Sequence, residues 1–104
     1  MEQAVIVHLP LSDERFGSSE DRDLLVALEG QITKAIEDAD AGEFDGDMFG
    51  EGECVLYMYG PDADRLFVAI EPVLRSYALR SGGYAIKRYG EVRDLNAKEV
   101  RVEL

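Results

Sequence analysis

The stretch from Gly42 to Asp64 concentrates the residues that could do chemistry. It reads GEFDGDMFGEGECVLYMYGPDAD and contains no Lys, Arg or His. Three of its residues match positions one, three and six of an EF-hand calcium loop: Asp45, Asp47 and Gly50. Phe49 and Leu56, however, occupy positions five and twelve, where the loop needs oxygen ligands, and the flanking residues predict strands rather than helices. We therefore expect no calcium site here.

His8 is the only histidine of the chain and Cys54 the only cysteine. A zinc site usually needs three or four such ligands, whereas two residues could still form a nucleophile–base pair. Both residues fall in predicted central strands, and strict alternation places them on opposite faces of the sheet. We therefore interpret both as structural residues and assign no catalytic residue, no metal ligand and no cofactor. The prediction leans away from an enzyme.

Glycine spacing and aromatic residues in the same stretch suggest two further classes of site. The glycines Gly46, Gly50 and Gly52 lack the lysine and the strand–loop–helix setting of a phosphate-binding loop, and they fit a hairpin instead. Tyr57 and Tyr59 resemble the base-stacking aromatics of RNA-recognition domains. No basic residue accompanies these tyrosines, so we do not expect RNA binding.

The net charge of −11 is distributed unevenly along the 104 residues. Residues 35–64 carry ten acids and no base, residues 1–34 carry seven acids and three bases, and residues 65–104 carry five acids and eight bases. A strong negative field repels nucleic-acid phosphates and anionic lipid, which argues against nucleic acid and membrane surfaces as partners. The alternative is that the acids only keep the protein in solution.

Hydrophobic periodicity predicts one domain, 1–104, with the element order β-α-β-β-α-β-β. The apolar runs 4–9 and 54–59 read as central strands, because both of their faces are apolar. Helices are expected from Ser18 to a stop at Gly42, with a Ser18–Asp21 capping box, and from Asp62 or Asp64 onward, with a kink or a broken first turn at Pro72. The remaining strands are expected at residues 43–48, 84–89 and 100–104, with a hairpin loop at 49–52.

This element order predicts an α+β, ferredoxin-like two-layer sandwich, in which two helices cover one face of an antiparallel sheet. The usual strand order, 4-1-3-2, makes the first and third strands central, and the fifth strand would pair beside the fourth. By alternation, Phe44 and Met48 would pack under the helices beside Cys54, Leu56 and Met58. Glu43, Asp45 and Asp47 would face the other way.

The pattern GEFDG…GE…LYMYGPDAD, with the RYG at Arg88–Gly90, resembles a set of short bacterial proteins of unassigned function. The resemblance spans most of the chain from Gly42 onward. It implies no activity. It implies that the Gly42–Gly60 hairpin and the turn at Pro61 belong to a shared framework.

Alternation leaves an apolar and aromatic sheet face away from the helices, formed by Ala4, Ile6, His8, Val55, Tyr57 and Tyr59 and extended by Ala85 and Tyr89. We expect this face to form a homodimer unless the fifth strand or the loop 11–17 covers it. The predicted function is a small, acidic, cytoplasmic interaction module that also takes a basic protein as a partner. One version of this prediction is an immunity-like or antitoxin-like protein. Its predicted interaction surface comprises Glu43, Asp45, Asp47, Tyr57, Tyr59 and His8. The alternative is a small enzyme or ligand sensor that uses the open sheet face.

Overall fold

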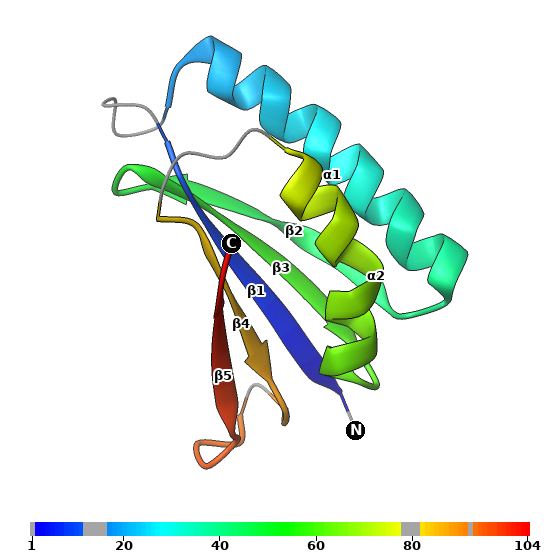
Figure 1. Ribbon diagram of the computed structural model, residues 1–104. Helices are drawn as coiled ribbons and strands as arrows, with labels where there is room; N and C mark the ends of the chain where they lie inside the picture. Colours follow the sequence, from blue (N-terminus) through cyan, green and yellow to red (C-terminus); the bar gives the residue numbers. More distant parts are fainter. Residues whose placement is uncertain (1, 12–16, 78–81, 92) are drawn as a thin grey trace.

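The protein contains five strands and two helices in the order β1, α1, β2, β3, α2, β4, β5 (Figure 1). The structure, a computed structural model, describes residues 2–11, 17–77, 82–91 and 93–104. The expected loop at 11–17 falls largely outside these ranges. The elements are β1 (Gln3–Pro10), α1 (Ser19–Ala39), β2 (Glu43–Gly50), β3 (Glu53–Gly60), α2 (Ala63–Ser76), β4 (Tyr84–Arg88) and β5 (Glu99–Glu103).

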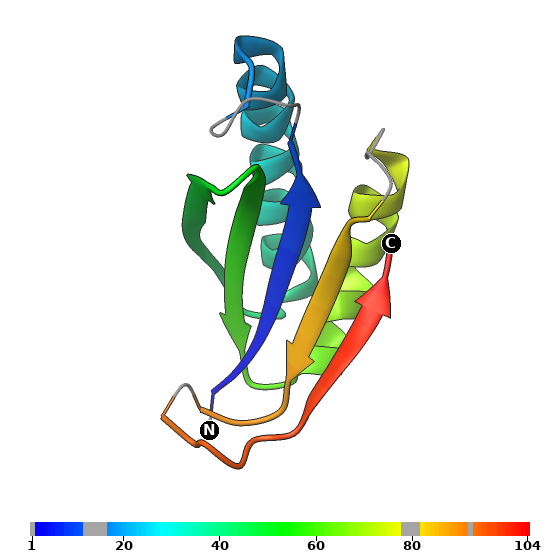
Figure 2. The same cartoon turned by 90° about the vertical axis from the view of Figure 1, so that its left-hand side faces the viewer.

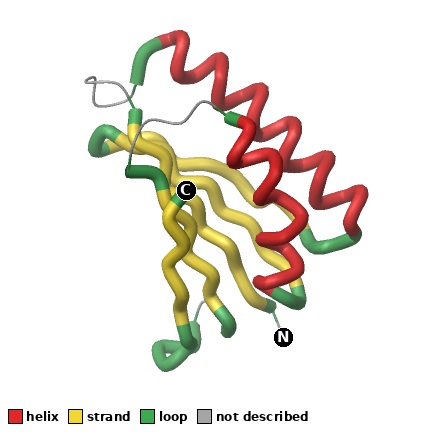
Figure 3. The backbone as a smooth tube through the Cα atoms, in the orientation of Figure 1, coloured by secondary structure: helices red, strands yellow, loops and turns green. Residues whose placement is uncertain are grey.

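The strands form one antiparallel sheet in the order β2-β3-β1-β4-β5. Both helices pack on the same face of this sheet, and Figure 2 shows them behind the strands with no described helix in front. The tube in Figure 3 shows the same two layers, with the strands strongly twisted. The predicted α+β class and the arrangement of a helical layer on an antiparallel sheet are therefore confirmed.

The hydrophobic core lies between the helices and the sheet. Alternate residues of the two central strands are fully buried there, as expected for strands that carry helices on one face: Val5, Val7 and Leu9 from β1, and Cys54, Leu56 and Met58 from β3. The helices contribute residues at helical spacing: Leu25, Leu28, Ile32 and Ile36 from α1, and Leu66, Ile70 and Leu74 from α2.

Side chains cap both helices at their N-termini. Ser18 and Asp21 form the predicted capping box of α1, in which the Ser18 hydroxyl accepts from the Asp21 N–H at 3.1 Å. Asp62 caps α2 by accepting from the N–H groups of Asp64 and Arg65. Pro72, where the sequence predicts a kink or a broken turn, lies inside α2, and the helix continues through it to Ser76.

The C-terminus of α1 differs from the prediction. The helix ends at Ala39, and the residue that adopts the left-handed conformation is Asp40, with φ 49°, rather than Gly42. The last turn of α1 contains no basic residue. The cation that suits the negative end of the helix dipole comes from α2 instead, because Arg65 Nη2 donates to the Ala39 carbonyl at 2.7 Å.

A β-bulge in β2 moves the side chains of the second half of the strand to the opposite face of the sheet. Phe44 pairs with Met58, but the next pair is Gly46 with Tyr57, so that Asp45 is the extra residue. As a result Asp47 lies opposite Leu56 on the helix side, and Met48 lies opposite Val55 on the other side, where it is 59% exposed. The prediction was therefore wrong for both residues. The hairpin loop is also shorter than predicted: Glu51 and Gly52, both with positive φ, form a two-residue turn.

Two glycines allow the backbone before β2 to touch the backbone at the end of β3. A Cβ atom built on Gly42 would lie 2.0 Å from the Tyr59 carbonyl oxygen, and one built on Gly60 would lie 2.2 Å from the Ala41 carbonyl oxygen. Gly42 also has φ 146°, which residues with a side chain rarely adopt. Since the obstacles are backbone atoms, no side-chain rotation could relieve either clash.

Replacing Gly42 by Ala is expected to lower the free energy of unfolding by about 2–4 kcal/mol, because clash and backbone strain act together. Chemical denaturation measures this difference. Gly30→Ala is the matched control. Gly30 lies within α1 and a Cβ there would meet no atom within 4 Å, so this change should instead stabilise the protein by up to ~1 kcal/mol. Equal effects of the two substitutions would contradict the role assigned to Gly42.

Candidate functional site

The candidate site is the face of the sheet turned away from the helices, called the open face below. The strand pairings place its residues in three rows, each crossing the sheet from β2 through β3, β1 and β4 to β5. The middle row is Gly46, Tyr57, Ile6, Ile86 and Arg101; the rows on either side are Met48, Val55, His8, Tyr84 and Glu103, and Glu43, Tyr59, Ala4, Arg88 and Glu99.

The centre of the open face is apolar and aromatic. Ala4 and Val55 are buried by the side chains around them, and Ile6, Tyr57 and Tyr59 are half-buried. The fifth strand does not fold over this centre, because β5 pairs beside β4 at the edge of the sheet. The tyrosines thus keep part of their rings in solvent, as is common at interfaces.

The prediction was wrong about which β4 residues reach the open face. Ala85 is fully buried on the helix side, opposite Val7. Tyr89 packs against the core, and its hydroxyl donates to Asp64, which also accepts from Lys87 at 2.9 Å. These two hydrogen bonds lower the pKa of the Asp64 carboxyl. Tyr84 and Ile86 take the places on the open face, in the rows of His8 and Ile6.

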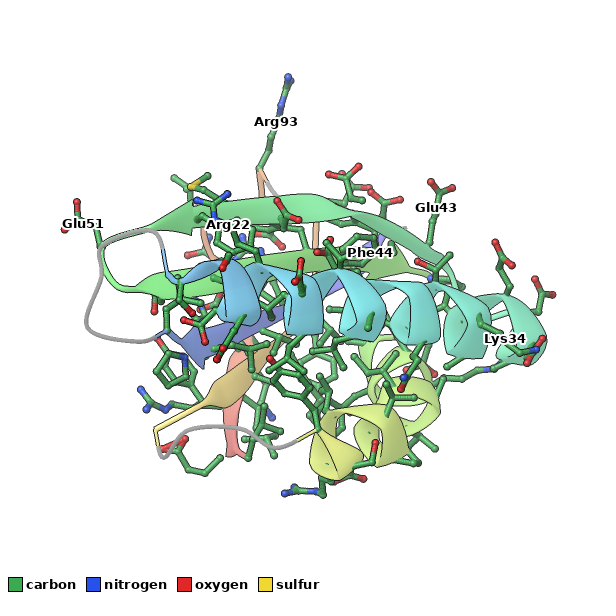
Figure 4. All side chains as sticks on the ribbon, turned by 90° about the horizontal axis from the view of Figure 1, so that it is seen from above. Arg22, Lys34, Glu43, Phe44, Glu51 and Arg93 are labelled. Carbon is green, nitrogen blue, oxygen red and sulfur yellow. The ribbon has the colours of Figure 1, made fainter. Side chains whose placement is uncertain are left out.

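Two of the three predicted acids lie at the β2 margin of the open face. Glu43 pairs with Tyr59 and is exposed, and Figure 4 shows it pointing away from the body of the protein while Phe44 lies between β2 and α1. Burial raises the pKa of the Tyr59 hydroxyl, and the charges of Asp45 and Glu2 raise it further, which places both carboxylates near this ring. Asp47 is the exception, because the bulge turns it to the helix side.

A chain of polar and aromatic contacts crosses the open face from β3 to β5. His8 Nδ1 lies 3.2 Å from Glu53 Oε1, and the His8 ring stacks on Tyr84 with a centroid distance of 4.6 Å. The guanidinium of Arg101 covers the Tyr84 ring at 3.7 Å and also pairs with Glu103. Of these residues only His8 was predicted. The sequence carries no local signal for the others, because 45 residues separate His8 from Glu53.

On the helix side, Asp47 meets Glu29 of α1. Burial, a hydrogen bond with Asp47 and the Asp47 charge together raise the pKa of Glu29 to about 7. Below that pH the Glu29 carboxyl is protonated and donates its proton in the hydrogen bond with Asp47. Burial and the charges of Asp47 and Glu29 also raise the pKa of the nearby Cys54 thiol to about 12, so this cysteine is protonated and unreactive at neutral pH.

A hollow of about 540 Å³ lies beside Tyr59 at the end of β3. Its wall combines the carboxylates of Glu2, Asp40 and Glu43 with the guanidinium of Arg65, which is held by the Ala39 carbonyl. The hollow is wide open. Its carboxylates extend the acidic edge formed by Glu43 and Asp45 of β2 towards the end of α1.

Within the described ranges, no group of three or more His, Cys, Asp or Glu side chains could hold a metal ion. The two aspartates of the partial EF-hand match have different neighbours, Tyr59 for Asp45 and Glu29 for Asp47, because the bulge separates them. Among the described helices, none is both long and apolar enough to cross a membrane.

The chain matches no family model, no curated protein and no solved structure. The resemblance of its Gly42–Asp64 pattern to short bacterial proteins therefore stays a prediction.

We predict that Glu29→Gln stabilises the protein at pH 8. The substitution should also make the free energy of unfolding less dependent on pH between pH 4.5 and 7. The ordinary carboxyl pKa of 4.5 is raised to about 7 in the folded state, so the folded protein binds more protons than the unfolded chain across this interval. The free energy of unfolding of the natural protein therefore falls as pH rises through the interval. Melting temperatures measured from pH 4 to 8 test this. Glu43→Gln, a change at an exposed glutamate, should leave the slope unchanged.

Proposed function

We propose that this protein is a small, non-enzymatic interaction module that self-associates through its open face. The observation that carries the proposal is the group of half-buried aromatic and aliphatic side chains at the centre of that face, Ile6, Tyr57 and Tyr59, over which no described helix or strand folds. Two-fold pairing is the commonest way in which a protein covers such a face. The proposed setting is the cytoplasm of a bacterium.

We further propose that the fold is a ferredoxin-like sandwich with one added strand. The order β2-β3-β1-β4 supports this, because β1 and β3 occupy the two central positions, and β5 is then the addition at the β4 edge. Sandwiches of this class leave one sheet face without helices, which is the face used here.

Tyr57→Asp is expected to abolish self-association while leaving the fold intact. A carboxylate at the centre of a buried interface would be left without a partner, which costs several kcal/mol. Sedimentation velocity at micromolar concentration measures the effect. Val68→Asp is the matched control, because Val68 is 68% exposed on α2 and far from the open face. A natural protein that is monomeric across this range, or a Tyr57→Asp variant that stays dimeric, would refute self-association.

We also propose a basic protein as a partner for the acidic margin, which comprises Glu43 and Asp45 together with Glu2 at the hollow beside Tyr59. Carboxylates gathered on one side of a surface attract cations and speed their association. This partner would meet the margin from the side, mainly through Glu43 and Glu2 beside the hollow.

Changing Glu43 to Gln and Asp45 to Asn together should leave stability unchanged or slightly raised, since both residues are exposed and neighbouring like charges are removed. Binding of a lysine-rich peptide, followed by fluorescence anisotropy at low salt, should weaken about tenfold. The matched control is Glu37→Gln with Asp38→Asn, which removes the same charge from the end of α1. If both pairs weaken binding equally, only the net charge matters and the margin is no docking site.

The second candidate function is a small enzyme or ligand sensor. The observation that favours it is the contact of His8 Nδ1 with Glu53, because a carboxylate at one ring nitrogen orients the other as a proton acceptor. The side chain of His8 is 22% exposed, on the same face as Tyr84. The hollow of about 540 Å³ lies beside Tyr59, in another row of the open face than His8. A pocket closed at a dimer interface around His8 and Glu53 would favour this function.

A further inference from the structure

The open face is electrostatically asymmetric about β1. On the β2 and β3 half it carries three carboxylates, Glu43, Asp45 and Glu53. The β4 and β5 half carries two arginines and two glutamates, whose charges cancel: Arg88, Arg101, Glu99 and Glu103. One half is therefore acidic and the other is neutral but contains both arginines of the face.

Two identical faces can stack about a two-fold axis in two simple ways. An axis across the strands places β2 of one copy over β2 of the other, so that acidic half meets acidic half. An axis along β1 places β2 of one copy over β5 of the other, so that each acidic half meets the neutral half that contains both arginines. Glu43 then comes over Glu99, whose charge is already paired with Arg88. Packed sheets lie about 10 Å apart, which is close to the screening length at physiological salt, so this difference in charge is felt across the interface.

Arg101 is well placed to receive a carboxylate from a second copy. Its side chain is 54% exposed, and its guanidinium lies on the Tyr84 ring, which fixes its position. Glu103 accepts from its Nε, yet a guanidinium has five N–H donors, more than one carboxylate takes up. Arg88, by contrast, is 15% exposed and is held by Glu99 and by the carbonyls of Glu91 and Asp94.

The middle row of the open face brings these groups into register. Gly46 and Arg101 stand at its two ends, with Ile6 at its centre. With the axis along β1 and through Ile6, Arg101 of one copy comes over Gly46 of the other, beside the bulged and exposed Asp45. Gly46 has no side chain to obstruct Arg101, and Ile86 then packs over Tyr57 of the second copy.

We propose that two copies of this chain pair face to face about an axis along β1, with Arg101 of each protomer meeting Asp45 of its partner. The proposal rests on the self-association proposed above and specifies its geometry. Each ion pair occurs twice in the dimer, because the interface is isologous.

Charge reversal of each residue, alone and in mixture, tests this geometry. Arg101→Glu and Asp45→Lys should each raise the dimer dissociation constant at least about tenfold, because each creates two like-charge contacts. An equimolar mixture of the two variants should form a heterodimer of near-natural affinity, since both contacts are then between opposite charges. Native mass spectrometry identifies the heterodimer by its mass, and sedimentation gives the affinities. Lys34→Glu, at an exposed residue of α1 that pairs with Asp38 on the same helix, should leave the dissociation constant unchanged.

The outcomes separate this proposal from the one on which it rests. If the natural protein is monomeric, self-association itself fails. The natural protein could instead be dimeric while Arg101→Glu dimerises with natural affinity and its mixture with Asp45→Lys associates no more tightly than each variant alone. The axis along β1 is then wrong, and self-association stands. If Arg101→Glu does not fold, Arg101→Gln replaces it: its mixture with Asp45→Lys should bind more tightly than Asp45→Lys alone, and an equal affinity would overturn the proposal.

Discussion

The backbone contact at Gly42 and Gly60 is the constraint that determines which residues of β2 lie on the open face. It joins the segment after α1 to the end of β3, so β2 must start beside the strand with which it pairs. Glu43 therefore enters the sheet opposite Tyr59, and the acids of β2 are held at the margin of the open face. A side chain at either glycine would push these two segments apart. The position of the acidic margin is thus set by two residues that carry no charge.

The bulge at Asp45 explains most of what the sequence could not show about β2. Period-two alternation is valid only while pairing is regular, and one extra residue moves every later side chain to the opposite face. Asp47 consequently meets Glu29, where burial makes a second negative charge unfavourable, and Met48 is left in solvent. The glycine at position 46 is compatible with a bulge but equally with an ordinary hairpin, so the sequence alone does not distinguish the two.

The helices, strands and helix caps were predictable because they depend on residues that are close in the sequence. The sheet face on which a side chain lies, and the contacts between strands, depend instead on the strand register. The capping box at Ser18 and the apolar stripes of both helices follow from spacing over a few residues. For β4, either alternate set of residues could have faced the helices, and only pairing of Tyr84 with His8 decides between them. The contacts from Glu53 through His8 to Tyr84 and Arg101 likewise join four strands that are distant in the sequence.

The asymmetry of the open face has a simple origin in the order of the chain. The acidic middle third forms β2 and β3, the last third, which has more bases than acids, forms β4 and β5, and β1 lies between them. The strand order therefore converts a charge gradient along the sequence into a charge gradient across one face. A protein with net charge −11 repels its own copies at a distance, so association requires short-range contacts that outweigh this repulsion. A face with unlike halves supplies them only when the copies are turned so that unlike halves meet.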